Sequence, residues 1–196
     1  MARSTKMGAE QTRDRLLSTA KTLFETKGYA ETSVADISAA AGTTKGALFH
    51  HFSNKEALFR EVWQDLQEEM DQKARKNAKA ARSRTDPYAA FLAGCRVYLD
   101  YTTRADYQKI VLIDGPSVLG EPGWYESDHY IGGQNVRAGM RWIAKKGIIS
   151  RDRVEPLAVM LRSALNGAGF SISRGTPGIT ADSVFDAFER LVRNLR

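Results

Sequence analysis

The sequence has few of the residues from which disulfides, metal centres and membrane spans are built. It contains one cysteine and three histidines. The single cysteine, Cys95, excludes an internal disulfide, and its apolar neighbours predict a small buried side chain. No stretch of about eighteen apolar residues is present, and the N-terminus lacks the apolar block of a signal peptide. We therefore expect a soluble protein of the cytoplasm that has no membrane partner.

Sequence motifs of the common enzyme classes are also absent. The chain has no phosphate-binding GxxxxGK[ST] loop, no GxSxG nucleophile turn and no HExxH zinc motif. The adjacent His50 and His51 would point about 100° apart on a helix, so a rigid helix cannot direct both of them to one metal ion. Asp114 is expected to be a cap or turn residue rather than a catalytic acid. We therefore predict that the protein is not an enzyme and holds neither a metal ion nor a cofactor.

The charge of the chain is positive and unevenly distributed. The formal net charge is +6 and the isoelectric point is near 9.5, which suits a polyanionic partner such as nucleic acid. Residues 73–84, KARKNAKAARSR, contain six Lys or Arg residues and no acidic residue. Two interpretations stay open for this segment, a solvated helix face and a surface that meets phosphates.

Apolar residues recur at helical spacing along the chain, and neither a strand pattern nor an internal repeat is visible. The predicted helices cover residues 11–27, 34–41, 44–51, 54–70, 91–102, 107–112, 126–146, 153–173 and 181–196. Ser33, Thr44, Asn54 and Thr180 precede four of them as caps for the free backbone amides. The segment DGPSVLGEPG, at residues 114–123, is expected to be a loop because it has two prolines and three glycines. The fold class is therefore all-α, with about nine helices.

The second and third predicted helices have the spacing of a helix-turn-helix. Ile37 and Leu48 would be the packed apolar pair, Ser38 the small residue at the crossing, and Gly42 the turn glycine. A generic helical hairpin accounts equally well for these four residues.

The N-terminal end of the third helix favours DNA recognition over a plain hairpin. Thr43, Thr44, Lys45, Gly46 and Ala47 place small, hydrogen-bonding or cationic groups there, as an element that enters the major groove requires. A structural helix has no need of Gly46, because glycine lowers helix propensity by about 1 kcal/mol relative to alanine.

The segment GYAETSVADISAAAGTTKGALFHHFSNKEAL, residues 28–58, resembles the DNA-binding signature of the tetracycline-repressor (TetR) family of bacterial transcription regulators. With the preceding helix, the resemblance covers about residues 13–62, roughly a quarter of the chain. It implies a helix-turn-helix domain at residues 1–60, with the helix-turn-helix itself at about 33–52. It also implies a second domain at residues 61–196 that binds ligand and dimerises.

The resemblance assigns roles to single residues of the first domain. The DNA-binding residues that it implies are Thr32 and Ser33 at a phosphate, Thr43, Thr44, Lys45, Gly46 and Ala47 at the bases, and His50 and Lys55 at backbone phosphates. Phe49 stands where the family commonly has tyrosine, so its ring edge can rest on the DNA backbone but cannot donate a hydrogen bond. We also expect Phe49 and Phe52 to wedge the third helix against the first, with His51 directed toward the fourth helix.

The second domain would, by resemblance, be a helical bundle with a small-molecule pocket and a dimer interface. The small residues at 158–169 permit close helix approach, which supports a dimer through the last two helices, about residues 153–173 and 181–196. The candidate ligand-binding residues are Tyr98, Tyr101, Trp124, His129, Trp142, Asn166 and Phe170, and the further aromatic candidates are Tyr107, Tyr125 and Tyr130. For each of them, core packing is the alternative.

The combined prediction is a homodimeric transcriptional regulator, most simply a ligand-responsive repressor of a palindromic operator in double-stranded DNA. Its effector is an unidentified small molecule. The alternative is a ligand-independent DNA-binding corepressor that a protein partner controls.

Overall fold

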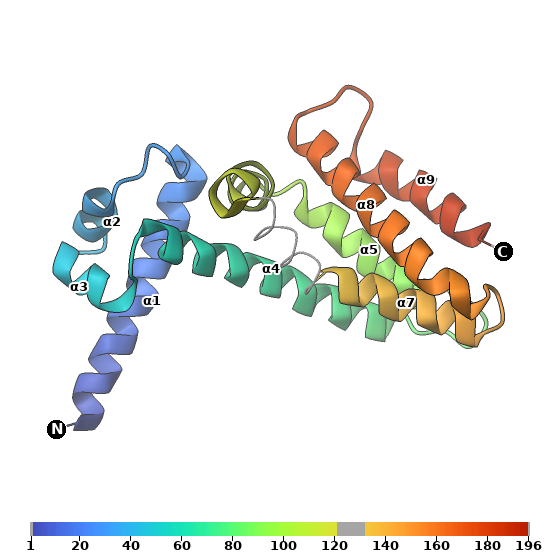
Figure 1. The fold of residues 1–196 in the computed structure, drawn as a ribbon, viewed down its shortest axis with the longest axis horizontal. Coiled ribbons are helices and arrows are strands. Elements are labelled where there is room, and N and C mark those ends of the chain that lie inside the picture. Colours follow the sequence, from blue (N-terminus) through green and yellow to red (C-terminus); the bar gives the residue numbers. More distant parts are fainter. Residues whose placement is uncertain (1, 121–131, 196) are drawn as a thin grey trace.

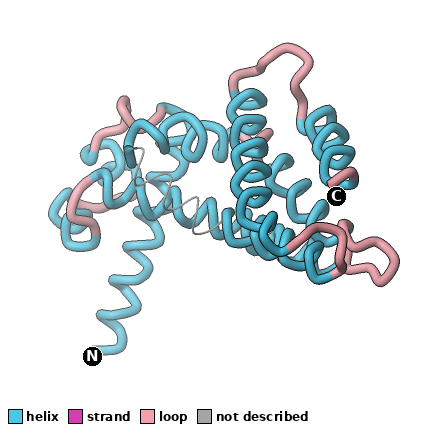
Figure 2. The backbone as a smooth tube through the Cα atoms, turned by 45° about the vertical axis from the view of Figure 1, so that its right-hand side comes forward, coloured by secondary structure: helices cyan, strands magenta, loops and turns pink. Residues whose placement is uncertain are grey.

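The computed structural model describes residues 2–120 and 132–195, and the side chains from residue 8 onward within these ranges. The described residues form helices and loops, without a strand (Figures 1 and 2). The elements are α1 (Ala2–Lys27), α2 (Val34–Ala40), α3 (Lys45–His51), α4 (Lys55–Ala80), α5 (Ala89–Tyr101), the π-helix η1 (Tyr107–Asp114), α7 (Gln134–Lys145), the 3-10 turn η3 (Arg151–Arg153), α8 (Val154–Ser173) and α9 (Ala181–Arg193). The predicted all-α fold class is confirmed.

Side-chain caps start four of these helices, as predicted. The side-chain oxygens of Ser33, Thr44, Asn54 and Thr180 each accept a hydrogen bond from the backbone amide three residues later, at 2.7 to 3.1 Å. These bonds satisfy amides that have no partner inside the helix. The caps therefore fix the start of α2, α3, α4 and α9 from short sequence signals.

Two apolar cores hold the helices together, and α4 runs between them. The first core joins α1, α2, α3 and most of α4 to η1, and its largest fully buried side chain is Trp63. The second core joins α5, α7, α8 and α9 around Phe91, Met140 and Phe188. In Figure 1, α4 extends from the α1–α3 unit at one end of the molecule to the α7–α9 bundle at the other. The predicted domain boundary at residue 60 falls inside this helix.

The predicted loop at residues 114–123 is wrong over its first part. Residues 115–120 continue the helix that begins with η1, and residues 121–123 lie outside the described residues. Pro116 has no backbone N–H to donate, and it falls just after the residue at which the π-helical turns of η1 give way to α-helical ones. Of the helix predicted at 126–146, residues 132–133 are π-helical and α7 follows from Gln134, while residues 126–131 lie outside the described residues.

None of the described helices combines the length and the apolar character that crossing a lipid bilayer requires.

Candidate nucleic-acid interface and ligand cavity

The start of α2 is built around Ser33. Its hydroxyl accepts a hydrogen bond from the Asp36 amide at 3.1 Å, and the Asp36 carboxylate accepts one from the Ser33 amide at 3.0 Å. The hydrogen bonds from Ser33 lower the pKa of the Asp36 carboxyl. Ser33 is nevertheless exposed. Its position at the open end of α2 is therefore compatible with the predicted phosphate contact.

Thr32 is turned into the protein, so its side chain does not have the predicted position at a phosphate. The residue is fully buried, and its hydroxyl donates to the Gly28 carbonyl at 2.7 Å. A second carbonyl, that of Leu23, lies 3.3 Å from the same hydroxyl. The resemblance therefore misplaced this side chain, which closes the turn after α1.

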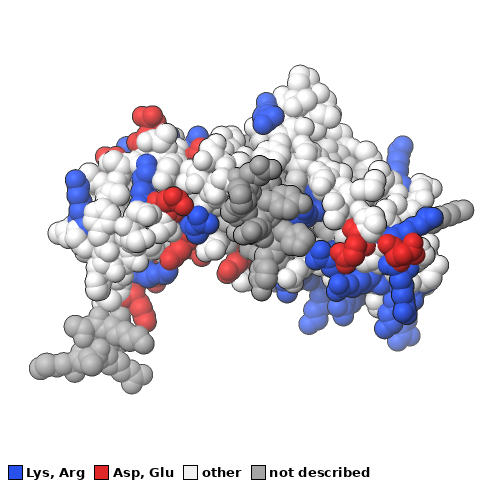
Figure 3. Space-filling view, viewed as in Figure 1, with Lys and Arg blue, Asp and Glu red and all other residues white. Residues whose placement is uncertain are grey.

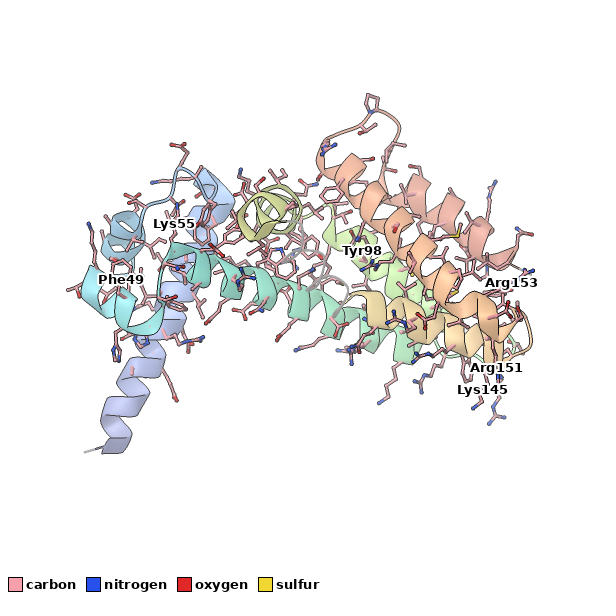
Figure 4. The ribbon with its side chains drawn as sticks, in the orientation of Figure 1. Phe49, Lys55, Tyr98, Lys145, Arg151 and Arg153 are labelled. Atoms are coloured by element: carbon pink, nitrogen blue, oxygen red, sulfur yellow. The ribbon has the colours of Figure 1, made fainter. Side chains whose placement is uncertain are left out.

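Lys55 has a structural role inside the protein, and its predicted phosphate contact stays a prediction. Its ammonium donates to the backbone carbonyls of Tyr29 at 2.8 Å and Thr32 at 2.9 Å. It also lies 4.0 Å from the centre of the Tyr29 ring, where a cation is attracted to the aromatic face. Two of its three donors are thus used inside the protein. Lys55 ties the α1–α2 turn to the first turn of α4 (Figure 4).

The outer face of α3 carries most of the predicted base-facing residues. Thr44, Lys45 and Gly46 are exposed, while Thr43 and Ala47 are half-buried. Leu48 and Phe52 are buried and hold the helix on the first core. A Cβ atom added at Gly46 would meet only the Thr44 hydroxyl, at 3.8 Å. Packing inside the protomer therefore gives no reason for a glycine at this exposed helix position.

Phe49 does not wedge α3 against α1 as predicted. Its side chain is 51% exposed, whereas Phe52 is 2% exposed. The reason is helical geometry, since Phe49 is one residue beyond the buried Leu48 and Phe52 is one turn beyond it. Figure 4 places Phe49 on α3, at the end of the molecule away from α7 and α8.

The two adjacent histidines of α3 differ in exposure. His50 is exposed and His51 is half-buried, with ring centres 5.3 Å apart. Among the residues that the structure describes, no group of three His, Cys, Asp or Glu side chains could hold a metal ion. His50 is therefore exposed to solvent on α3, as Lys45 and Phe49 are.

A cavity of about 660 Å³ lies between α4, α5, α7 and α8. This volume falls in the range of small-molecule sites, and most of the lining is apolar or aromatic. Three predicted ligand residues, Tyr98, Trp142 and Asn166, come together in its wall. The Tyr98 hydroxyl donates to the Asn166 side-chain oxygen at 3.2 Å, which fixes both polar groups at the cavity surface.

Other predicted ligand residues lie elsewhere. Tyr101 is buried in the first core and its hydroxyl donates to Glu69 at 2.9 Å, while Phe170 packs against that core. Tyr107 is likewise buried and hydrogen-bonded to Gln67. Tyr101 and Tyr107 are buried and Phe170 is half-buried in this packing, which supports the core-packing alternative for these residues. The predicted ligand residues Trp124 and His129, with Tyr125 and Tyr130, lie outside the described residues.

Sequence reasoning missed the contribution of α4 to the cavity. Arg75, Lys79 and Arg82 line it from the C-terminal part of this helix and its end. Their spacing of four and three residues placed them on one helix face, but the apolar partners of that face are far along the chain. Cys95 also lines the cavity and is buried, and burial raises the pKa of its thiol. The predicted buried cysteine is confirmed.

The basic run of residues 73–84 lies away from α3. Figure 3 shows Lys and Arg side chains gathered along the lower edge of the molecule at the α4–α7 end. All six Lys and Arg residues of the run are exposed. The run therefore belongs to the cavity end of the protein and does not extend the α3 surface.

The π-helix η1 connects the cavity end to the helix-turn-helix. Asp114 at its end accepts a hydrogen bond from the Tyr29 amide at 2.8 Å and forms an ion pair with Lys109 at 3.2 Å. Asp114 lies inside a helix that continues to residue 120, so the predicted cap or turn role is wrong. Its carboxylate instead fixes the α1–α2 turn across 85 residues of sequence.

A second carboxylate, Asp106, joins the same parts of the chain. It forms ion pairs with Lys21 of α1 at 3.0 Å and with Arg104 at 2.7 Å, and Arg104 also binds Glu69 of α4 at 2.7 Å. Burial raises the pKa of Asp106, but the hydrogen bonds from Arg104 and Lys21 outweigh it and leave the pKa below its ordinary value. The charged form of Asp106 therefore stabilises the contact between α1 and the segment after α5.

Comparison with known families matches both parts of the chain. Residues 16–62 match the family described as bacterial regulatory proteins, tetR family. Residues 88–195, more than half of the chain, match the family described as tetracyclin repressor-like, C-terminal domain. The chain belongs to the TetR family. Membership of this family of regulators agrees with the prediction that the protein is not an enzyme.

Individual relatives of this TetR-family chain carry regulator names. The HTH-type transcriptional regulator AcrR of Shigella flexneri is 45% identical over 64 residues, 33% of this chain and 30% of the relative. The HTH-type transcriptional regulator TtgR of Pseudomonas putida is 38% identical over 87 residues, 44% of this chain and 40% of the relative. The chain thus spans less than half the length of these curated relatives. A solved TetR-family transcriptional regulator from Pectobacterium atrosepticum has a TM-score of 0.80 and 31% identity, over 96% of each chain.

Proposed function

We propose that the protein is a transcriptional repressor that binds a palindromic operator in double-stranded DNA as a homodimer, with each α3 in a major groove. One observation carries this proposal. Leu48 and Phe52 fix α3 on the core, while Lys45, Gly46 and His50 face solvent. The regulator names of the TetR-family relatives support it. Such a repressor acts on DNA in the cytoplasm.

The outer surface of α8 and α9 supports a homodimer. Met160 is 66% exposed and Leu191 is 53% exposed, although both are large apolar residues. Ser163, Ala164 and Gly167 continue the exposed face of α8 with small side chains. Large exposed apolar residues beside small ones suit the close approach of another helix. The same face of a second copy would cover both, as a two-fold axis requires.

Regulation by a small molecule is the second part of the proposal. Residues 1–60 form the DNA-binding domain and residues 61–196 the domain for ligand and dimerisation, and α4 belongs to both. The same helix that begins at the Lys55 contact lines the cavity from Met70 onward. A ligand in the cavity that favours one position of α4 would shift the spacing of the two α3 helices. The cavity favours this mode over control by a protein partner.

The test is DNA binding by the purified protein at several salt concentrations. The DNA is the region upstream of its own gene, with random DNA of equal length as the reference. Two α3 surfaces that meet about six phosphates should give a slope of log affinity against log salt on the order of −5 or steeper. Lys45→Ala should flatten this slope by about 1 to 2 units, since both protomers lose a cation.

The matched control is Lys145→Ala, which removes the same charge at the opposite end of the molecule (Figure 4). It should leave the slope unchanged. A complex that does not depend on salt, or equal effects of the two substitutions, would show that α3 is not the DNA-binding surface.

A further inference from the structure

The charged residues at the cavity have one sign. Among the described residues that line it, Arg75, Lys79, Arg82 and Arg162 are cationic, and no Asp or Glu is present. Arg162 is buried in the wall on α8 and has an interaction of its own. The other three come from the exposed side of α4 and the turn after it. Positive charge therefore stands beside the cavity opening, next to an apolar interior.

Two of these three cations are available for a ligand. Arg75 forms an ion pair with Asp71 at 2.8 Å, and Asp71 also accepts a hydrogen bond from Asn135. Neither Lys79 nor Arg82 forms an ion pair with a residue that the structure describes. Their long apolar stems can cover the cavity while the charged groups stay at its edge. An anionic group at the cavity edge would be attracted by both cations. It could stay in contact with water there and would not have to be buried in the apolar interior.

The interior of the cavity suits an apolar body. Phe91, Tyr98 and Trp142 supply aromatic surface, and Ala78 and Gly94 leave room between α4 and α5. A Cβ atom added at Gly94 would stand 3.8 Å from the Ala74 carbonyl oxygen, which is ordinary contact distance. Contact with these surfaces removes apolar area from water and so stabilises a bound hydrocarbon chain or ring.

We infer that the effector is an amphipathic organic anion, whose acidic head group binds Lys79 and Arg82 and whose apolar body fills the cavity. This inference rests on the proposed function, since it names the ligand class of the same cavity. A neutral or cationic ligand would leave the two cations unused or would be repelled by them. Lys79 and Arg82 at the cavity edge select for an acidic head group, and contact with the apolar interior supplies most of the affinity.

Calorimetric titration of the full-length protein tests this inference. The probes are decanoate and 4-phenylbutyrate, each paired with its neutral primary alcohol. At least one anion should bind once per chain, and about tenfold or more tightly than its alcohol. Decanoate and 4-phenylbutyrate both carry a carboxylate. The ratio of their dissociation constants therefore shows whether the cavity prefers an alkyl chain or an aromatic ring.

Charge variants on α4 locate the head group. Lys79→Gln with Arg82→Gln should weaken binding of the anion by about 5- to 30-fold and leave binding of the alcohol unchanged. Lys73→Gln with Lys76→Gln removes the same charge from exposed positions of α4 that do not line the cavity, and should have little effect. Ala78→Phe, at a half-buried cavity position, should weaken binding of the anion and the alcohol alike.

Three results would overturn the inference: equal affinity for acid and alcohol, equal effects of the two charge variants, or no binding of either anion. In each case, the salt dependence of DNA binding tests the proposed function independently of the ligand titration. A protein that binds DNA but neither anion keeps its proposed role and loses only this ligand class. A protein that binds the anion but no DNA loses the proposed function.

Discussion

Ser38 shows how a single atom can weaken the helix-turn-helix. The residue is 3% exposed, and its hydroxyl has no hydrogen-bond partner among the described residues. A buried hydroxyl without a partner costs about 1–3 kcal/mol. We therefore expect Ser38→Ala to raise the free energy of unfolding by about 1 kcal/mol, as measured by urea denaturation. Ser18→Ala, on the exposed face of α1, is the control and should change it by less than about 0.5 kcal/mol. A destabilised Ser38→Ala protein would mean that the hydroxyl is satisfied.

Gly46 gives the second prediction for a single residue. Gly46→Ala should stabilise the free protein by up to about 1 kcal/mol, because alanine has the higher helix propensity and the added methyl group meets only the Thr44 hydroxyl. The same methyl group would stand where α3 approaches the base edges. Operator affinity should therefore fall by about tenfold, or ~1.4 kcal/mol. Binding isotherms and urea denaturation of one preparation measure the two opposite effects. Unchanged operator affinity would place Gly46 away from the DNA.

Thr32 and Lys55 mark the limit of what sequence can predict at this scale. The caps at Ser33 and Thr44 were predictable because a cap depends on a side chain and an amide three residues away. The hydroxyl of Thr32 and the ammonium of Lys55 instead bind backbone carbonyls that only the folded α1–α2 turn presents. Their residue types suit phosphate equally well, so tertiary structure decides between the two roles.

At the scale of elements, the part of the chain that follows η1 was the hardest to predict. The helix predicted at 107–112 lies within η1, but apolar spacing does not distinguish a π-helix from a regular one, and the prolines and glycines at 114–123 favoured a loop. The structure shows why the segment is helical. Tyr107 and Ile110 pack in the first core, and Asp106 and Asp114 join the segment to α1 and to the turn that follows it. These partners lie more than 75 residues earlier in the chain.

The Asp106 contact gives a prediction on pH. The pKa of Asp106 is lower in the folded protein than its ordinary value, so its charged form favours folding. This stabilisation is complete above the ordinary pKa of about 4 and disappears as the pH falls through the folded value. Asp106→Asn should therefore cost about 2 kcal/mol at pH 7, and this cost should shrink as the pH falls through the folded pKa of Asp106. Denaturation of both proteins at several pH values measures the difference. A penalty that does not change as the pH falls below about 4 would show that shape, not charge, matters at Asp106.

At the scale of the whole molecule, the helical bundle was predicted, and by resemblance a pocket within it, but not which of the candidate residues line that pocket. Tyr98, Trp142 and Asn166 were chosen for their chemistry and do line it, whereas Tyr101 and Phe170 have the same chemistry and pack elsewhere. The aromatic residues are alike in sequence, and only the packing of α4, α5, α7 and α8 decides which of them borders open space.

The dimer gives the prediction that belongs to the whole molecule. Met160 on α8 and Leu191 on α9 are exposed, whereas Leu195 is half-buried and packs against the second core. Met160→Glu with Leu191→Glu should therefore separate the protomers without disturbing the fold, because two charges in each copy would have to be buried at the interface. Light scattering should report a monomer with an unchanged helical circular dichroism spectrum. Operator affinity should fall by about 100-fold or more, because each half-site is then bound alone.

The control for the dimer prediction is Ile113→Glu. Ile113 is 46% exposed on η1, outside α8 and α9, so it introduces the same charge at an apolar surface position. This variant should remain dimeric and bind operator DNA with normal affinity. If the Met160 and Leu191 variant also remains dimeric, the two protomers meet through another surface. If it is monomeric but binds the operator as tightly as the wild type, one copy of α3 is sufficient and the palindromic operator is excluded.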